Sequence, residues 1–203
     1  MNKNITKALV GLTLGVALLG AGCQKGTPMK TDSTTGSDKM APVAPISGFN
    51  LYQNNTYKFR IQYPEKWSKE EGAYSTIVSF KSPEEAGDTF VENVNVVTED
   101  VSQVPGITPE KYEEAAIDQI KKSTELKNFK QTESKSMTLA GLPGRALVYT
   151  AKYGPSDVSL YTRQYLTIKN NTVYIITYTA SQEKPNAFMD EVQKMVGSFE
   201  ITK

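Results

Sequence analysis

Apolar and polar side chains alternate most regularly in the stretch TYKFRIQYPEKW, residues 56–67. Its apolar members recur at every second position, which predicts a β-strand with one face in the core. These core-facing members are Tyr57, Phe59, Ile61 and Tyr63. Pro64 is expected to end the strand, because proline has no N–H to donate to a neighbouring strand. Trp67 is expected to pack just beyond the turn.

Six more strands are expected, at residues 75–80, 90–99, 130–139, 145–153, 157–169 and 172–180. The last four are separated by the short sequences GLPG, GPS and NN, which are typical of tight turns. These four strands are therefore predicted to form an antiparallel meander. The last two carry apolar side chains on both faces, which indicates that the sheet is covered on both sides.

Two amphipathic helices are expected to supply this cover. Thr108 and Pro109 begin the first with a hydroxyl cap and a proline in the first turn. Its core-facing residues are predicted to be Tyr112, Ala115, Ala116 and Ile120. The second follows Pro185 and should stop at Gly197, with an apolar stripe of Phe188, Val192, Met195, Val196 and Phe199. This order of elements predicts the α+β class, with an antiparallel sheet between helical layers.

Tyrosines recur at spacings of four on the last three strands, and we expect them to stack across one sheet face. They are Tyr149, Tyr153, Tyr161, Tyr165, Tyr174 and Tyr178. Tyrosine combines contact area with a hydroxyl group and is enriched at interfaces. Two interpretations stay open: a helix packs over the tyrosines, or the face is exposed and contacts a partner. The candidate contact face consists of Tyr149, Tyr161, Tyr165 and Tyr174.

The N-terminus has the pattern of a secretory signal peptide over residues 1–22. Lys3 and Lys7 precede an unbroken apolar run, ALVGLTLGVALL, which ends in small residues before Cys23. The run of about a dozen residues is shorter than the ~20 that a membrane-spanning helix needs. The chain is therefore predicted to be exported rather than embedded.

Cys23 is the only cysteine in the chain, which excludes an intramolecular disulfide. The sequence LLGAGC resembles the bacterial lipobox, in which a cysteine at the cleavage point is acylated and becomes the mature N-terminus. One departure is Gly20, where leucine is usual. The alternative is a structural cysteine, with cleavage at an ordinary site nearby. Lipidation of Cys23 would hold the protein at the membrane, since two acyl chains give stable anchoring.

Residues 24–48 are rich in Ser, Thr, Gly, Pro, Lys and Asp and lack apolar periodicity. We expect residues 23–48 to be a lipidated cysteine and a disordered tether, whose flexible part spans roughly 25 to 30 Å. Residues 49–203 form the predicted domain. Removing Lys3 and Lys7 from the 23 basic residues leaves 21 against 22 acidic residues. This balance argues against nucleic-acid binding.

The order of elements and several motifs resemble the PsbP family. The matching stretches are YKFRIQYPEKW, ENVNVVTEDV before a helix, and VYIITYTASQEK followed by FMDEVQKMVGSFEI. The resemblance implies an α-β-α sandwich around a central antiparallel sheet of about six or seven strands flanked by helices. It also implies one of two roles: an extrinsic subunit on the lumenal side of photosystem II, or an exported lipoprotein of a bacterium without photosystems. The chain resembles the second group more.

Catalytic and metal-binding motifs are sparse. The sequence contains no histidine, which removes the usual general base and the commonest zinc ligand. SQEK, residues 181–184, matches the Ser-x-x-Lys form of acyl enzymes, but Pro185 follows at once and favours a strand exit. A weak calcium site is the remaining metal candidate, with oxygen ligands from Glu84, Glu85, Asp88 and Glu92.

The sequence therefore predicts a membrane-anchored, non-enzymatic binding or assembly module on the extracytoplasmic side, with a protein partner in the envelope. It predicts no cofactor and no catalytic residue. The alternative is a carrier of a small molecule or of an ion such as calcium, with a pocket between sheet and helix. Convergent polar groups in such a pocket would favour the carrier, whereas a filled core with an exposed aromatic patch would favour the binding module.

Overall fold

A computed structural model describes residues 43–84, 90–154 and 158–203. The predicted signal peptide, Cys23 and most of the predicted tether lie outside the described residues. So do Glu85 and Asp88 of the calcium candidate. Within the described ranges, no helix has the length and apolar character to cross a membrane.

The opening stretch belongs to a small three-stranded sheet. It consists of β1 (Phe49–Asn54), β2 (Phe59–Pro64) and β10 (Glu200–Ile201), in the order β1-β2-β10. Phe59 and Ile61 are fully buried, as the alternation predicts. The prediction that Tyr57 faces the core was wrong, because it lies in the turn between β1 and β2 and is 45% exposed. Lys58 has a φ of 58° in this turn, so the alternation begins only at Phe59.

Pro64 ends β2, as predicted, and the chain turns directly after it. The Trp67 amide donates a hydrogen bond to the Pro64 carbonyl over 2.9 Å. The Trp67 ring is buried and meets Phe188 edge to face, with 5.4 Å between ring centroids. The expected position of Trp67 is therefore confirmed.

The central sheet has seven strands in the order β3-β4-β5-β9-β8-β7-β6. Their bounds are β3 (Ser68–Glu71), β4 (Val78–Lys81), β5 (Asn93–Asp100), β6 (Leu126–Leu139), β7 (Leu142–Tyr153), β8 (Val158–Lys169) and β9 (Thr172–Ser181). Strands β6 to β9 form the predicted antiparallel meander. Two of its turns use left-handed residue pairs, Ala140 with Gly141 and Asn170 with Asn171.

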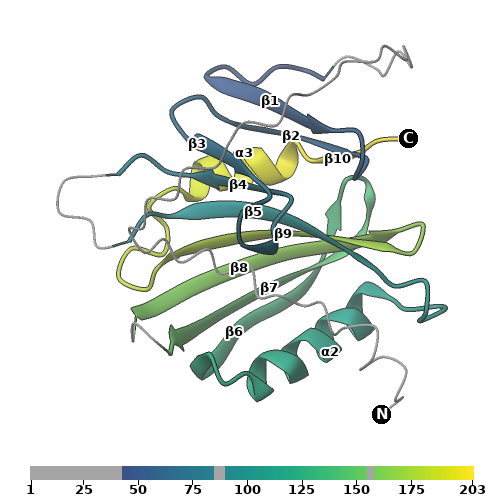
Figure 1. The fold of residues 1–203 in the computed structure, drawn as a ribbon, viewed down its shortest axis with the longest axis vertical. Helices are drawn as coiled ribbons and strands as arrows, with labels where there is room; N and C mark the ends of the chain where they lie inside the picture. Colours follow the sequence, from purple (N-terminus) through teal and green to yellow (C-terminus); the bar gives the residue numbers. More distant parts are fainter. Residues whose placement is uncertain (1–42, 85–89, 155–157) are drawn as a thin grey trace.

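Helix α2 (Pro109–Lys122) covers one face of this sheet, over β6, β7 and β8 (Figure 1). Thr108 caps it as predicted, accepting a hydrogen bond from the Lys111 amide over 3.4 Å. Tyr112, Ala116 and Ile120 are buried, whereas Ala115 is only partly buried. The helix therefore presents nearly the face that the sequence predicts.

Helix α3 (Met189–Gly197) packs on the other side together with the small sheet (Figure 1). Val192 and Met195 are fully buried here, in one cluster with Phe59, Ile61 and Phe199. Cover on both faces and the seven-stranded sheet are confirmed. The picture of a helical sandwich is too simple, because strands dominate and a second sheet shares the α3 layer. The strands β1, β3 and β10 were not predicted.

Candidate functional site

The four tyrosines of the predicted contact face do not share one side of the sheet. The register of β7 with β8 places Tyr149 opposite Thr162 and Tyr161 opposite Thr150. Odd-numbered residues of β7 therefore share a face with even-numbered residues of β8. Tyr149 lies on the α2 side, in a cluster with Ile120, whereas the others lie on the α3 side. The prediction of one tyrosine stack was wrong because spacing does not fix register.

Three of these tyrosines are also buried: Tyr149 is 1% exposed, Tyr165 7% and Tyr174 5%. Tyr161 is partly buried and meets Tyr178 edge to face. Tyr174 packs against Phe199, with 6.1 Å between ring centroids. The four residues therefore do not form an open contact face, and cover by packed elements is the interpretation that fits.

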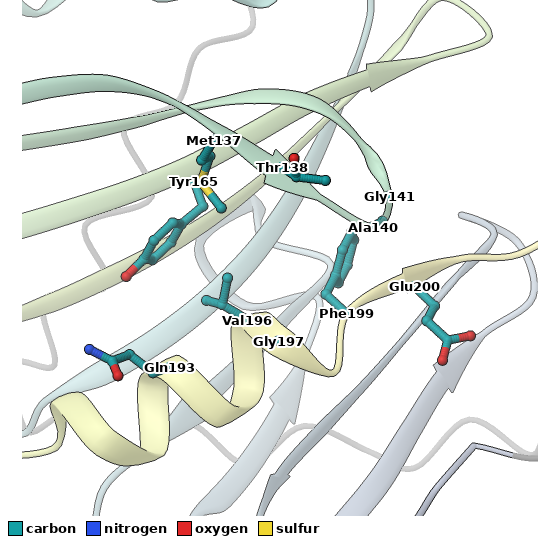
Figure 2. A pocket seen from close by; sticks show the side chains of 10 residues that line it. All are labelled: Met137, Thr138, Ala140, Gly141, Tyr165, Gln193, Val196, Gly197, Phe199 and Glu200. Carbon is teal, nitrogen blue, oxygen red and sulfur yellow. The ribbon is translucent and has the colours of Figure 1, made fainter.

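A pocket of about 470 Å³ opens between the β6–β7 hairpin and α3 (Figure 2). This volume lies in the usual range of ligand sites, about 300 to 1,000 Å³. The lining residues come from the hairpin, from β8, from α3 and from the segment that leads from α3 into β10. They are Met137, Thr138, Ala140, Gly141, Tyr165, Gln193, Val196, Gly197, Phe199 and Glu200.

The hairpin wall of the pocket is held close to β8 by Gly144. A Cβ atom on this residue would lie 2.4 Å from the carbonyl oxygen of Leu166, so no larger residue allows the same approach. The Thr167 hydroxyl also donates a hydrogen bond to the Pro143 carbonyl over 2.8 Å. These contacts fix β7 against β8, and β6 pairs with β7 so that Met137 lies opposite Gly144.

The helical wall is fixed where α3 ends. Gly197 is the last helical residue, which agrees with the predicted stop. The backbone N–H of Gln62 in β2 donates to the Ser198 hydroxyl over 2.9 Å. This hydroxyl in turn donates to the Met195 carbonyl over 2.7 Å. The bonds tie the helix end to the small sheet, and Val196 and Phe199 then face the hairpin (Figure 2).

Charge near the pocket is paired. Glu200 is the one charged residue in the pocket lining, and its carboxylate accepts hydrogen bonds from Nε and a terminal nitrogen of Arg60, at 2.9 and 2.5 Å. Beyond Tyr165, Arg163 donates to the Tyr161 hydroxyl over 3.2 Å. Burial raises the pKa of Tyr165, so its hydroxyl stays protonated at neutral pH. The pocket therefore suits an uncharged, largely apolar group.

Among the described residues, the other two chemical candidates, the SQEK stretch and the carboxylates of the calcium site, do not come together as a site. Ser181 ends β9, and its hydroxyl accepts a hydrogen bond from the Glu183 amide over 3.2 Å, so SQEK is a strand exit. Of the calcium candidate, Glu84 is exposed and Glu92 is buried. Among the residues that the structure describes, no group of three or more carboxylate, cysteine or histidine side chains is placed to hold a metal ion.

Sequence reasoning expected a pocket between sheet and helix only as the carrier alternative and named no residues that line it. Tyr165 was singled out for the contact face instead. Val196 and Phe199 appeared only as part of an apolar helix stripe, and Met137 only as a strand residue. Their apolar character is visible in the sequence. Their convergence depends on how a helix end and a hairpin meet across the sheet, which no spacing within one element reveals.

Beneath α2, the Tyr112 hydroxyl donates to Glu99 over 2.5 Å, and burial raises the pKa of Glu99 above its ordinary value of 4.5. The folded chain therefore holds this proton more tightly than the unfolded chain, and stability falls as pH rises above 4.5. We expect Glu99→Gln to raise the free energy of unfolding at pH 7, with a gain that shrinks toward pH 4.5. Urea unfolding of the wild type and the variant between pH 4.5 and pH 7 measures this gain in the free energy of unfolding.

The neighbouring Asp100 provides the control, because its pKa is shifted in the opposite direction to that of Glu99. The Ser102 amide donates to its carboxylate over 2.8 Å and lowers its pKa, so Asp100→Asn should not stabilise the protein at pH 7. Equal effects of the two substitutions at every pH would contradict the account of Glu99.

Comparison with known structures finds a similar fold in several proteins. PsbP of the cyanobacterium Synechocystis sp. PCC 6803 is 13% identical, with a TM-score of 0.58 over 81% of this chain and 98% of that one. LpqN of Mycobacterium tuberculosis, described as involved in cell envelope biogenesis, is 14% identical, with a TM-score of 0.53 over 71% and 83%. The Saccharomyces cerevisiae Ran-binding protein Mog1p is 8% identical, with a TM-score of 0.56 over 76% and 96%.

No curated protein matches the chain by sequence. The family model described as PsbP-like protein, however, matches residues 32–201, which is most of the chain. The match covers both sheets, helices α2 and α3 and every residue that lines the pocket. The chain therefore belongs to the PsbP-like protein family.

Proposed function

We propose that the protein is an exported, membrane-anchored binding module without catalytic activity, which holds its domain on the extracytoplasmic side of the envelope. The signal-peptide pattern of residues 1–22 and the lipobox resemblance around Cys23 support the export and the anchor. Two proteins of similar fold support the binding role and the place, since one is named as a Ran-binding protein and the other is described as involved in cell envelope biogenesis.

The pocket between the β6–β7 hairpin and α3 is the observation that carries the binding role. Gln193, Gly197 and Gly141 are exposed at its rim, whereas Phe199 and Tyr165 are buried in its wall. An open pocket with apolar walls and paired charges suits an apolar side chain inserted by a protein partner. Burying one such side chain contributes about 1.5 to 3 kcal/mol.

The variant Val196→Gln tests this role, because it places a polar amide in the apolar wall. We expect the partner's affinity to fall by about tenfold or more, which corresponds to the loss of one buried apolar contact. The measurement is recovery of a partner that is cross-linked to the full-length protein in its own cells and captured through a C-terminal tag.

Lys194→Gln is the matched control, since it places the same residue on an exposed position of the same helix, outside the pocket. Its recovery of partner should equal that of the wild type. Equal recovery from Val196→Gln, or recovery of nothing but the protein itself from wild-type cells, would contradict the proposal.

The volume of the pocket also favours a second candidate, a carrier of a small apolar molecule. Native mass spectrometry of the protein released gently from its own membranes distinguishes the two. A bound small molecule that is present in the wild type and lost in Val196→Gln would favour the carrier. A role with calcium or with a photosystem stays a prediction of the family resemblance.

A further inference from the structure

The open edges of the two sheets differ in how they are protected against pairing with another strand. Edge strand β3 is four residues long, fully exposed and carries three charged residues. Edge strand β6 is long, but its register with β7 shifts twice, between Lys127 and Lys130 and between Gln131 and Glu133. Short length, charges and bulges are the usual devices that prevent edge-to-edge association.

Edge strand β1 has none of these devices. Its six residues, FNLYQN, contain no charge and no proline, and they pair with β2 in one uninterrupted register from Phe49 to Asn54. Leu51 on this strand is 51% exposed. Among the residues that the structure describes, the exposed large hydrophobic side chains are Leu51 and Tyr57, which lies in the adjoining turn. The combination of an unprotected edge and exposed apolar side chains indicates a strand that pairs with another chain.

We propose that β1 pairs antiparallel with β1 of a second copy, so that the two small sheets form one continuous six-stranded sheet. Closed two-fold dimers are the commonest homo-oligomers, and the contact uses the same patch on both copies. The absence of charge on β1 favours pairing with a second copy, because no like charges then lie opposite each other on the two β1 strands.

The two-fold geometry also suits two anchored copies. Antiparallel pairing of identical strands places the two-fold axis perpendicular to the sheet, so the same face of both small sheets points the same way. The start of the described chain lies on the face of the small sheet that carries Gln62. The Ile46 backbone amide donates to the Gln62 side chain over 2.8 Å, and that side chain donates to the Ala44 carbonyl over 3.0 Å. Gln62 pairs with Leu51, so both side chains lie on the same face. This face is opposite to the one on which the neighbouring Ile61 enters the core. The described chain therefore begins on the same side in both copies, which suits the two anchors in one membrane that the proposed function assumes.

The test is the oligomeric state of the full mature chain. It is measured in detergent by sedimentation over a concentration series, and in native membranes by chemical cross-linking. We expect a dimer for the wild type. Leu51→Lys should raise the dissociation constant by about tenfold or more, since it sets like charges across the axis and removes apolar contact.

Gln131→Lys is the control, because it adds the same charge to the exposed β6 edge and should leave the dimer unchanged. Thermal unfolding of both variants excludes misfolding. A monomer at every concentration together with no cross-linked pair in membranes overturns the proposal, and so does a Leu51→Lys variant that dimerises like the wild type. Either result leaves the role of the pocket intact, because the pocket lies on different elements.

Discussion

Replacing Glu113 with alanine is expected to lower the free energy of unfolding by about 3 kcal/mol or more. Glu113 lies on the sheet-facing side of α2 and is 3% exposed. Its carboxylate accepts hydrogen bonds from Arg145 Nε over 2.7 Å and from the Ser134 hydroxyl over 3.0 Å. Truncation would leave the Arg145 guanidinium, whose side chain is 14% exposed, without its carboxylate partner. An uncompensated, nearly buried charge is the physical reason for the size of the effect.

Denaturant unfolding measures this loss, with Glu114→Ala as the matched control. Glu114 is the next residue on the same helix and is exposed, so its truncation should change stability by less than about 0.5 kcal/mol. The double variant Glu113→Leu with Arg145→Met removes both charges together and should recover most of the loss. Similar losses for Glu113→Ala and Glu114→Ala would show that the ion pair does not hold α2 to the sheet.

Trp67→Ala should cost about 3 to 5 kcal/mol of stability, because it empties a large site in the core. Trp67 is 5% exposed and packs edge to face on Phe188, just before α3. The substitution therefore removes the contact that joins the end of β2 to the start of the helix that borders the pocket. Urea unfolding monitored by far-ultraviolet circular dichroism measures the loss without depending on tryptophan fluorescence.

Lys66→Ala is the appropriate comparison for Trp67, since it truncates the exposed neighbouring residue and should lie within about 0.5 kcal/mol of the wild type. A Trp67→Ala protein as stable as Lys66→Ala would mean that the opening motif is dispensable for folding.

The parts of the fold that follow from local chemistry were predictable. Phe59 and Ile61 are visible as alternating core positions, Thr108 as a helix cap and Asn170 with Asn171 as a tight turn. The exposed strand β3, with its sequence SKEE, has no apolar alternation, so nothing in the sequence marks it as part of the central sheet.

The parts that depend on contacts between distant segments were not predictable. The spacing of the tyrosines does not specify the register that separates Tyr149 from Tyr161. A glutamate at position 113 gives no sign that Arg145, 32 residues away, will accompany it beneath α2. The pocket likewise lies where the hairpin, which approaches β8 closely at Gly144, meets the end of α3 at Gly197.

The pocket connects the fold to the proposed function through its contact with a partner. Placing a photoreactive amino acid at Gln193, on the rim, tests this contact most directly. The matched control carries the same group at Glu110, which is exposed on α2, on the opposite face of the sheet. After illumination of living cells, we expect a discrete cross-linked partner from position 193 and none from position 110. The same products from both positions, or none from position 193, would contradict the account.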